Sequence, residues 1–406
     1  PVIEWDFRNG LENWEGHFIT TPTKSAEGIT FKPTSFEWTY DPIKLGGSVI
    51  SPSIKLPSDQ YVRVVIRMKS TAGKACNLYY YFGDEFLEHQ NEAVILNNDG
   101  QFHDYQMFIQ DPPGEDSHFM ILPSDATEAE ITLQSIKVER MTPHSVPYAR
   151  PVVPNGSDPR IITSGALEIH HYGERLGNFQ VKYSNTDMAV GYQSEVLGLK
   201  NGSSVKWINL ETKPAFINKG AGSDFTITSS FEGDGANWTI ERNFYTESNG
   251  CISVTSSFCV DKDREVILVP WLTLYAGLGS FGGQKNQAVL PGLEYLSSRD
   301  SSSNMKAITT VEHKRRIPDP VKLTIPLMAI TQNEHYVGLI WEQNEMTNAL
   351  FDSPDRLTDT ESHLMGVTGP AVGSNRVENE LAAHFPVVFK AGEIYSTTMT
   401  MIGGKG

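Results

Sequence analysis

Most of the chain alternates apolar and polar residues with a period of two, and the alternating runs stop at Gly, Pro, Asn or Asp. Between Asp224 and Val260, the turns EGDGAN and ESNGC separate three such runs, and Asn-Gly is a strong hairpin signal. A period of two sends successive side chains to opposite faces of a sheet. One segment, SNRVENELAAHF at 374–385, predicts a short helix, because Glu378 stands where a capping box needs it. The rest of the pattern predicts an all-β protein.

A Pro-rich segment divides the chain. Residues 143–159 hold five prolines and show no periodicity, which is typical of a linker. A chain of 406 residues is also long for a single domain. We therefore predict an N-terminal β domain at 1–142, a linker at 143–159 and a larger β domain at 160–406.

Charge and hydropathy argue against two kinds of partner. The chain has 33 Lys and Arg against 49 Asp and Glu, a net charge of −16, so we expect no binding to nucleic acid. No apolar run approaches the ~20 residues that cross a bilayer, so we expect no membrane span.

The runs before the linker have an informative order. EWDFRNGLENWEGHF comes first, and it is followed by GGSVISPSIKLPSDQYVRVVIRMKS, NLYYYFG, NNDGQFHDYQMFI and AEITLQSIKVER. This order resembles the jelly-roll sandwich of carbohydrate-binding modules that are attached to polysaccharide-degrading enzymes. The resemblance implies a two-sheet jelly roll, a polysaccharide or oligosaccharide as ligand, and a secreted or cell-surface location.

The chemistry of sugars points to a set of side chains in this domain. A pyranose has an apolar C–H face that stacks on aromatic rings, and hydroxyls that need polar partners. The residues that fit these needs on alternating strand positions are Trp38, Tyr40, Tyr79, Tyr81, Arg67 and His103. We predict that they line a sugar-binding groove. The alternative is that the aromatic rings fill the core of the sandwich.

Modules of this kind often carry a structural calcium ion. The resemblance therefore makes Glu4 and Asp6, at the first predicted strand, candidate calcium ligands. Carboxylates suit calcium, but two acidic residues do not by themselves define a site.

Two patterns in the second domain imitate functional motifs. Gly277-x-Gly279-x-x-Gly282 matches the dinucleotide-binding fingerprint, but the Pro and Gly residues that follow allow no helix to hold a pyrophosphate. His170 and His171 are adjacent, and neighbours on a strand point to opposite faces, so they do not chelate one metal ion together. Either histidine is then a cleft-facing residue or a hydrogen-bonded structural one.

The segment from Asp158 to Gly406 resembles the β super-sandwich of carbohydrate-active enzymes in its number of strands, its size and its position after a jelly roll. That fold occurs in aldose mutarotases and before the (α/α) toroid of glycoside hydrolases and polysaccharide lyases. The resemblance implies that a catalytic domain follows Gly406.

A long segment in this domain holds the candidate catalytic residues. Glu294 and Asp300 precede a Ser run, and His313 follows it in a basic cluster. Glycoside hydrolysis needs two carboxyl groups ~5–9.5 Å apart, and mutarotation needs an acid and a base across the sugar ring. Glu294, Asp300, His313 and His170 are residues of the right types, but their spacing selects none of them. One alternative is a structural loop whose acids pair with Arg299, Lys314, Arg315 and Arg316. The interpretation that we favour is a loop that helps to shape the cleft of a neighbouring domain.

Three functions remain open. The first is a non-catalytic, carbohydrate-binding segment of a secreted polysaccharide-degrading enzyme. The second is a self-contained enzyme, acting as a mutarotase, glycoside hydrolase or lyase through the second domain. The third is a structural or adhesive β protein.

Overall fold

A computed structural model describes residues 3–35, 47–57, 61–83, 91–109, 114–141, 151–202, 204–278, 280–298, 300–302, 317–318, 320–355, 360–371 and 386–406. These residues form β-strands and three short 3₁₀ helices, η1 (Phe7–Asn9), η2 (Leu210–Thr212) and η3 (Pro320–Lys322), so the prediction of an all-β protein is confirmed. The helix predicted at 374–385 lies outside the described residues. Across the described ranges, no helix has the length and apolar character to span a bilayer.

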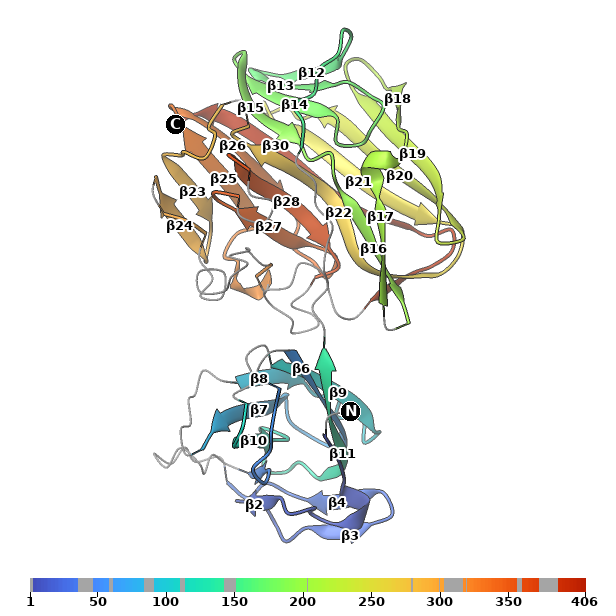
Figure 1. The fold of residues 1–406 in the computed structure, drawn as a ribbon, viewed down its shortest axis with the longest axis vertical. Helices are drawn as coiled ribbons and strands as arrows, with labels where there is room; N and C mark the ends of the chain where they lie inside the picture. Colours follow the sequence, from blue (N-terminus) through green and yellow to red (C-terminus); the bar gives the residue numbers. More distant parts are fainter. Residues whose placement is uncertain are drawn as a thin grey trace. The chain divides into compact units, whose positions relative to one another are not determined.

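The chain divides into two compact units, Pro1–Pro143 and His144–Gly406 (Figure 1). The division falls at the start of the Pro-rich segment that was predicted as a linker at 143–159. Each unit is described by itself below.

The first unit is a sandwich of two antiparallel sheets. Its strands are β1 (Ile3–Asp6), β2 (Glu15–His17), β3 (Thr23–Ser25), β4 (Gly28–Phe31), β5 (Ser48–Ile50), β6 (Tyr61–Ser70), β7 (Ala75–Phe82), β8 (Asn91–Ile95), β9 (His103–Ile109), β10 (Ser117–Leu122) and β11 (Ile131–Met141). One sheet has the order β3-β4-β11-β6-β9, with β1 also paired to β11, and the other has the order β2-β5-β10-β7-β8. We call them the six-stranded and the five-stranded sheet.

Alternation along β6 shows how the sequence builds this sandwich. Val62, Val64, Ile66 and Met68 are fully buried in the core between the sheets, whereas Arg67 and its alternate neighbours point to the outer face. Burial of these apolar side chains is the main force that holds the two sheets together.

The second unit contains two larger antiparallel sheets. Its strands are β12 (Arg160–Ser164), β13 (Leu167–His171), β14 (Phe179–Tyr183), β15 (Thr186–Gly191), β16 (Val196–Asn201), β17 (Ser204–Asn209), β18 (Phe216–Lys219), β19 (Phe225–Gly233), β20 (Ala236–Thr246), β21 (Ile252–Val260), β22 (Arg264–Ala276), β23 (Gln287–Leu290), β24 (Glu294–Ser297), β25 (Leu327–Gln332), β26 (His335–Trp341), β27 (Asn348–Asp352), β28 (His363–Gly369), β29 (Val387–Phe389) and β30 (Ile394–Lys405).

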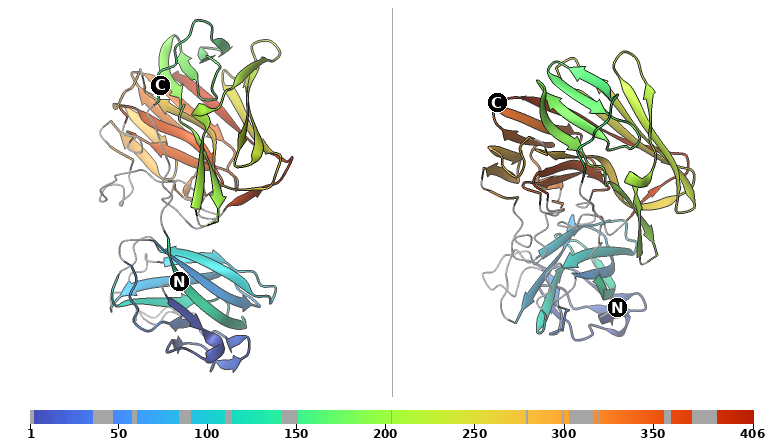
Figure 2. Two further views of the ribbon diagram at one scale, coloured as in Figure 1. Left: turned by 45° about the vertical axis from the view of Figure 1, so that its right-hand side comes forward. Right: turned by 45° about the horizontal axis from the view of Figure 1, so that its top comes forward.

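The ten-stranded sheet is organised around β22. Its main path is β12-β13-β14-β15-β22-β16-β17, and β22 also pairs with β28 and β29, while β27 pairs with β28. The nine-stranded sheet has the order β18-β19-β20-β21-β30-β26-β25-β23-β24, so that β30 lies in its middle. Figure 2 shows both sheets from two further directions.

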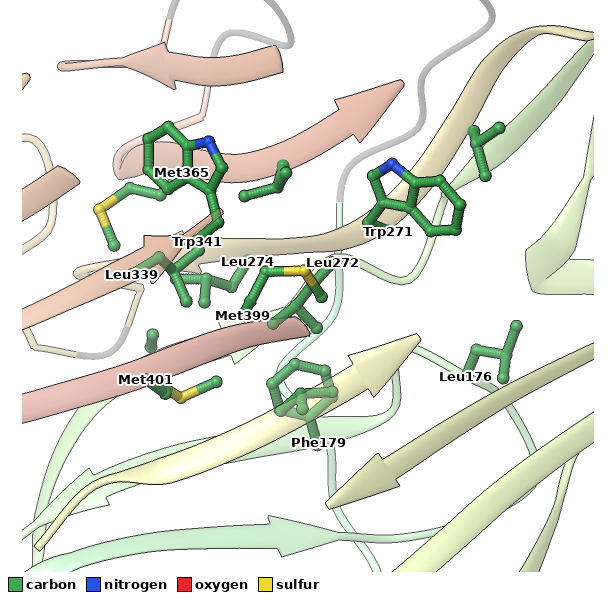
Figure 3. Close-up of a cluster of buried hydrophobic side chains, with 14 of the residues drawn as sticks. Leu176, Phe179, Trp271, Leu272, Leu274, Leu339, Trp341, Met365, Met399 and Met401 are labelled. Carbon is green, nitrogen blue, oxygen red and sulfur yellow. The ribbon is translucent and has the colours of Figure 1, made fainter. Parts of the chain in front are cut away.

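Large apolar side chains fill the space between these two sheets. Trp271 and Leu272 of β22 and Met365 of β28 come from one sheet, and Leu339 of β26 and Met399 of β30 come from the other (Figure 3). All five are buried, and they belong to one continuous core cluster. The packing of two sheet faces across such a core makes this unit a β-sandwich.

A charged pair also lies inside this core. The Arg242 guanidinium on β20 donates to the Glu195 carboxylate at 2.7 Å and to the Pro270 carbonyl at 3.1 Å. Glu195 precedes β16 of the ten-stranded sheet, and its other oxygen accepts from the Thr273 backbone N–H at 3.2 Å. The pair therefore bridges the two sheets.

The glycine motif after β22 does not open a helix. Gly277 has a φ of +85° and lies in a turn, and the next regular element is strand β23. A nucleotide pyrophosphate would find no helix N-terminus here, as expected from the sequence.

Candidate functional site

The two tyrosines predicted to bind sugar lie on the outer face of the five-stranded sheet. Along β7, Cys76 and Leu78 point into the sandwich core, so Tyr79 and Tyr81 point to the other side. They are nevertheless only 7% and 3% exposed. The two rings therefore do not belong to the core between the sheets, and their role in a sugar-binding groove stays a prediction.

The register between β7 and β10 builds a small cluster around them. His118 lies opposite Tyr81, and Met120 lies opposite Tyr79. Met120 also lies opposite Ile50 of β5, and Ile50, Tyr79, Tyr81 and Met120 form an apolar cluster separate from the sandwich core. The outer face of a sheet that meets water is commonly polar, so this cluster sets the face apart.

His118 stacks on this cluster and places polar ring nitrogens at its edge. Its ring lies parallel to that of Tyr81, with 5.2 Å between ring centroids and 17° between planes. Its Nδ1 lies 3.2 Å from the carbonyl oxygen of Ser51, and its Nε2 lies 3.6 Å from Oδ1 of Asp116. The Ser53 hydroxyl donates to the same Asp116 oxygen at 2.7 Å.

A second polar group is buried on this face. Ser48 of β5 alternates with the core residue Val49, so it shares the outer face with Ile50. Its hydroxyl is buried, and no described residue is a hydrogen-bond partner for it. Aromatic support together with a few polar groups is the usual composition of a small-molecule site.

Arg67 and His103 lie in the other sheet. The Arg67 guanidinium donates to Asp104 at 2.9 Å and to Gln134 at 2.9 Å, and it lies over the Phe102 ring. His103, at the start of β9, contacts Asp99 at 2.9 Å. The structure therefore does not bring these two side chains together with the tyrosines, because β6 and β9 belong to the six-stranded sheet.

Trp38, Tyr40 and His313 lie outside the described residues.

The acidic residues of β1 are already engaged. Both carboxylate oxygens of Asp6 accept from the Arg8 guanidinium, at 2.8 and 2.7 Å, and this hydrogen bonding lowers the pKa of Asp6. Glu4 pairs with Lys137 at 3.1 Å. Within the described ranges, no cluster of three or more His, Cys, Asp or Glu side chains could hold a metal ion. The calcium site at Glu4 and Asp6 stays a prediction.

Glu294 and Asp300 of the second unit have different surroundings. Glu294 begins β24 and is buried. The Asp300 carboxylate is exposed and accepts from the backbone N–H and the hydroxyl of Ser297, at 2.9 and 2.7 Å, and these bonds lower its pKa. Asp300 thus closes a turn, which is a structural use of its carboxylate.

A buried lysine, Lys285, connects this turn by a hydrogen bond to the segment before β23. The Lys285 ammonium donates to the backbone oxygen of Asp300 at 2.5 Å, and burial lowers the pKa of Lys285. Nearby, His363 of β28 accepts from the Ser353 hydroxyl at 2.9 Å, and burial lowers the pKa of His363 to about 4. Ser353 is itself buried.

The adjacent histidines His170 and His171 have opposite environments, as the alternation predicts. His170 contacts Glu168 at 2.7 Å and lies in the ten-stranded sheet, whereas Glu294 lies in the nine-stranded sheet. His171 is buried among phenylalanines, and burial lowers its pKa to about 3. Among the described candidates, His170 therefore belongs to a different sheet from Glu294.

The sequence interpretation missed several residues of the outer face, namely Ser48, Ile50, Asp116, His118 and Met120. The apolar run FMIL at 119–122 was available as a signal for a strand. The pairing of that strand with β7 could not be predicted, since nothing local specifies the register.

No family model matches the sequence, and no curated protein does. Solved structures with a similar fold include a module named BiXyn10A CBM1 in its ligand-free form, with 12% identity and a TM-score of 0.27, which covers 34% of this chain and 96% of that one. A second is the α-N-acetylgalactosaminidase NagBb from Bifidobacterium bifidum in complex with Gal-NHAc-DNJ, with 13% identity and a TM-score of 0.40. That match covers 60% of this chain and 36% of the other.

A third is a putative aldose 1-epimerase from Escherichia coli K12, with 9% identity and a TM-score of 0.38, over 61% of this chain and 99% of that chain. The fold resemblances predicted from the sequence, to a carbohydrate-binding module and to a mutarotase-like super-sandwich, are thus found again among solved structures. The matched region spans only about a third of the Bifidobacterium bifidum enzyme.

Proposed function

We propose that this chain is a non-catalytic, carbohydrate-binding segment of a secreted or cell-surface polysaccharide-degrading enzyme, and that its first unit binds a glycan at the outer face of the five-stranded sheet. The observation that supports the proposal is the cluster in which Tyr81 and His118 stack beside the Asp116 carboxylate. His118 and Asp116 have side chains that are 22% and 54% exposed, so they are the groups a sugar hydroxyl meets first.

In this proposal, the tyrosines position the residues that contact the sugar. Tyr81 is nearly covered, and its ring holds the imidazole of His118 in a fixed plane. Such support on a sheet pre-organises a site and reduces the entropy that is lost on binding.

Affinity electrophoresis of the full chain in gels that contain neutral polysaccharides tests the proposal. We expect retardation by at least one polysaccharide, and an affinity about tenfold weaker, or about 1.4 kcal/mol, for His118→Ala and for Tyr81→Ala. Tyr295→Ala is the matched control, since Tyr295 is a 72% exposed tyrosine on β24 of the second unit. Circular dichroism melts show whether each variant is folded.

Tyr81→Phe separates a role of the ring from a role of its hydroxyl, and it should keep the wild-type affinity if stacking on His118 is what matters. If the folded His118→Ala and Tyr81→Ala variants are retarded as strongly as the wild type, the glycan does not bind at this face. If no polysaccharide in the panel retards the wild type, the proposed binding function is wrong.

A further inference from the structure

A ring nitrogen of His118 and a carboxylate oxygen of Asp116 face each other at the edge of this cluster. The partner of His118 Nδ1 is a backbone carbonyl oxygen, which only accepts, so Nδ1 carries the proton. In the neutral imidazole, Nε2 is then an acceptor, and it lies 3.6 Å from Asp116 Oδ1. Two hydroxyls of a sugar, each donating one hydrogen bond, satisfy both atoms.

The backbone holds Asp116 in this position. Asp116 precedes β10 with a φ of +54°, in the left-handed region that Asp and Asn adopt more readily than most residues. The Ser53 hydroxyl donates to Oδ1, and the Gly83 N–H donates to the Asp116 backbone oxygen at 3.0 Å. The carboxylate is therefore oriented on the same face as His118, while more than half of its surface stays open to solvent.

The charge of this group has a consequence for the choice of glycan. A carboxylate accepts hydrogen bonds from hydroxyls, but it repels the carboxylates of uronates and the sulfates of sulfated sugars. We propose that Asp116 is a specificity-determining residue that makes the site on the five-stranded sheet select neutral glycans and reject anionic glycans of the same backbone. This inference rests on the proposed carbohydrate binding.

The test uses polymer pairs that share a backbone and differ in charge, such as hydroxyethyl and carboxymethyl cellulose, or methyl-esterified and de-esterified homogalacturonan. For each pair that includes a binder, affinity electrophoresis of the full chain gives the ratio of neutral to anionic affinity. We expect the wild type to prefer the neutral polymer. We expect Asp116→Asn to lower that ratio by about two- to fivefold, because an exposed charge contributes at this scale.

Asp104→Asn is the matched control. Asp104 has a side chain that is 51% exposed and lies in the six-stranded sheet, so its substitution removes the same charge at similar exposure from another place. The control should leave the ratio unchanged. Asp116→Gly is the second variant, because glycine adopts a positive φ without strain, and it should lower the ratio in the same way.

The two proposals fail in different ways. If no neutral polymer retards the wild type, the proposed binding function is lost. If a neutral polymer retards the wild type but its anionic partner does so equally, or if both Asp116 variants keep the wild-type ratio, then charge selection by Asp116 is overturned and the binding function stands. A change in Asp104→Asn as large as that in Asp116→Asn would also overturn it, since net charge alone would then explain the effect.

Discussion

Arg242 and Glu195 are fully enclosed between the two sheets of the second unit, where a charge without a partner is costly. Burial raises the pKa of Glu195, and the neighbouring guanidinium opposes this. We predict that Arg242→Met lowers the free energy of unfolding of the second unit by about 3–5 kcal/mol, since it leaves the carboxylate buried and unpaired. Calorimetric or denaturant unfolding of the full chain measures this change.

Lys390→Met is the control for this variant. Lys390 pairs with Asp263 at 2.8 Å with both side chains about half exposed, and such pairs contribute about 0–1 kcal/mol. The double variant Arg242→Leu with Glu195→Leu should recover most of the lost stability, because it removes both charges. A single variant as mild as the control would show that water reaches the pair.

Two buried histidines make the second unit sensitive to acid. Burial lowers the pKa of His171 to about 3 and that of His363 to about 4, whereas both titrate near 6.5 in the unfolded chain. Between these values the unfolded state binds more protons, so stability is complete above about pH 6.5 and falls as the pH drops toward 4. We predict a falling midpoint of thermal unfolding over this range.

His171→Leu separates this effect from general acid instability. The variant loses the hydrogen bonds to Gly173 and Leu176 and is less stable at neutral pH, but one titrating group is gone. Its stability should therefore fall less steeply between pH 6.5 and 4 than that of the wild type. An unchanged slope would contradict the assignment.

At the scale of single strands, the sequence pattern correctly predicted which side chains share a face of a strand. It did not predict which strands pair with each other. The LYYYF run placed Tyr79 and Tyr81 on one face, and the structure agrees. Arg67 lies on the outer face of its strand, as its apolar neighbours predict. The contacts of these faces come from the pairing of β7 with β10 and of β6 with β9, and such register depends on tertiary packing rather than on local pattern.

The β23–β24 hairpin gives the same lesson for the second unit. The sequence identified Glu294 and Asp300 as candidate acids. It did not predict that Glu294 is buried or that Asp300 closes a turn by hydrogen bonds to Ser297. Lys285, which donates a hydrogen bond to this turn, and His363 come from other segments, and only the folded sheets bring them near each other. Local spacing therefore could not decide between a catalytic and a structural use.

The environment of this hairpin leads to a prediction about activity. A pair of carboxyl groups must flank the scissile bond for glycoside hydrolysis, and Glu294 is buried while Asp300 is bound to Ser297. We predict that the purified chain releases no reducing ends and no unsaturated products from plant or microbial polysaccharides. Turnover that Glu294→Gln or Asp300→Asn abolishes would contradict this and would make the hairpin an active site.

At the scale of the whole molecule, the chain is expected to behave as two folding units. The contacts divide it at Pro143, and Val152 and Val153 in the following segment are exposed. We predict that limited proteolysis cuts within 143–159 and releases an N-terminal fragment that unfolds cooperatively at its own midpoint. If neither fragment stays folded after cleavage, the two units depend on each other.

Strand β30 has a consequence for how the second unit is made. It lies between β21 and β26, so residues 394–405 join two groups of strands that are otherwise unconnected within the nine-stranded sheet. A ribosome delivers the chain from its N-terminus, and the first unit has every strand it needs long before β30 emerges. Until then β21 and β26 each expose an unpaired edge, so nascent chains stalled before residue 394 should recruit chaperones or aggregate.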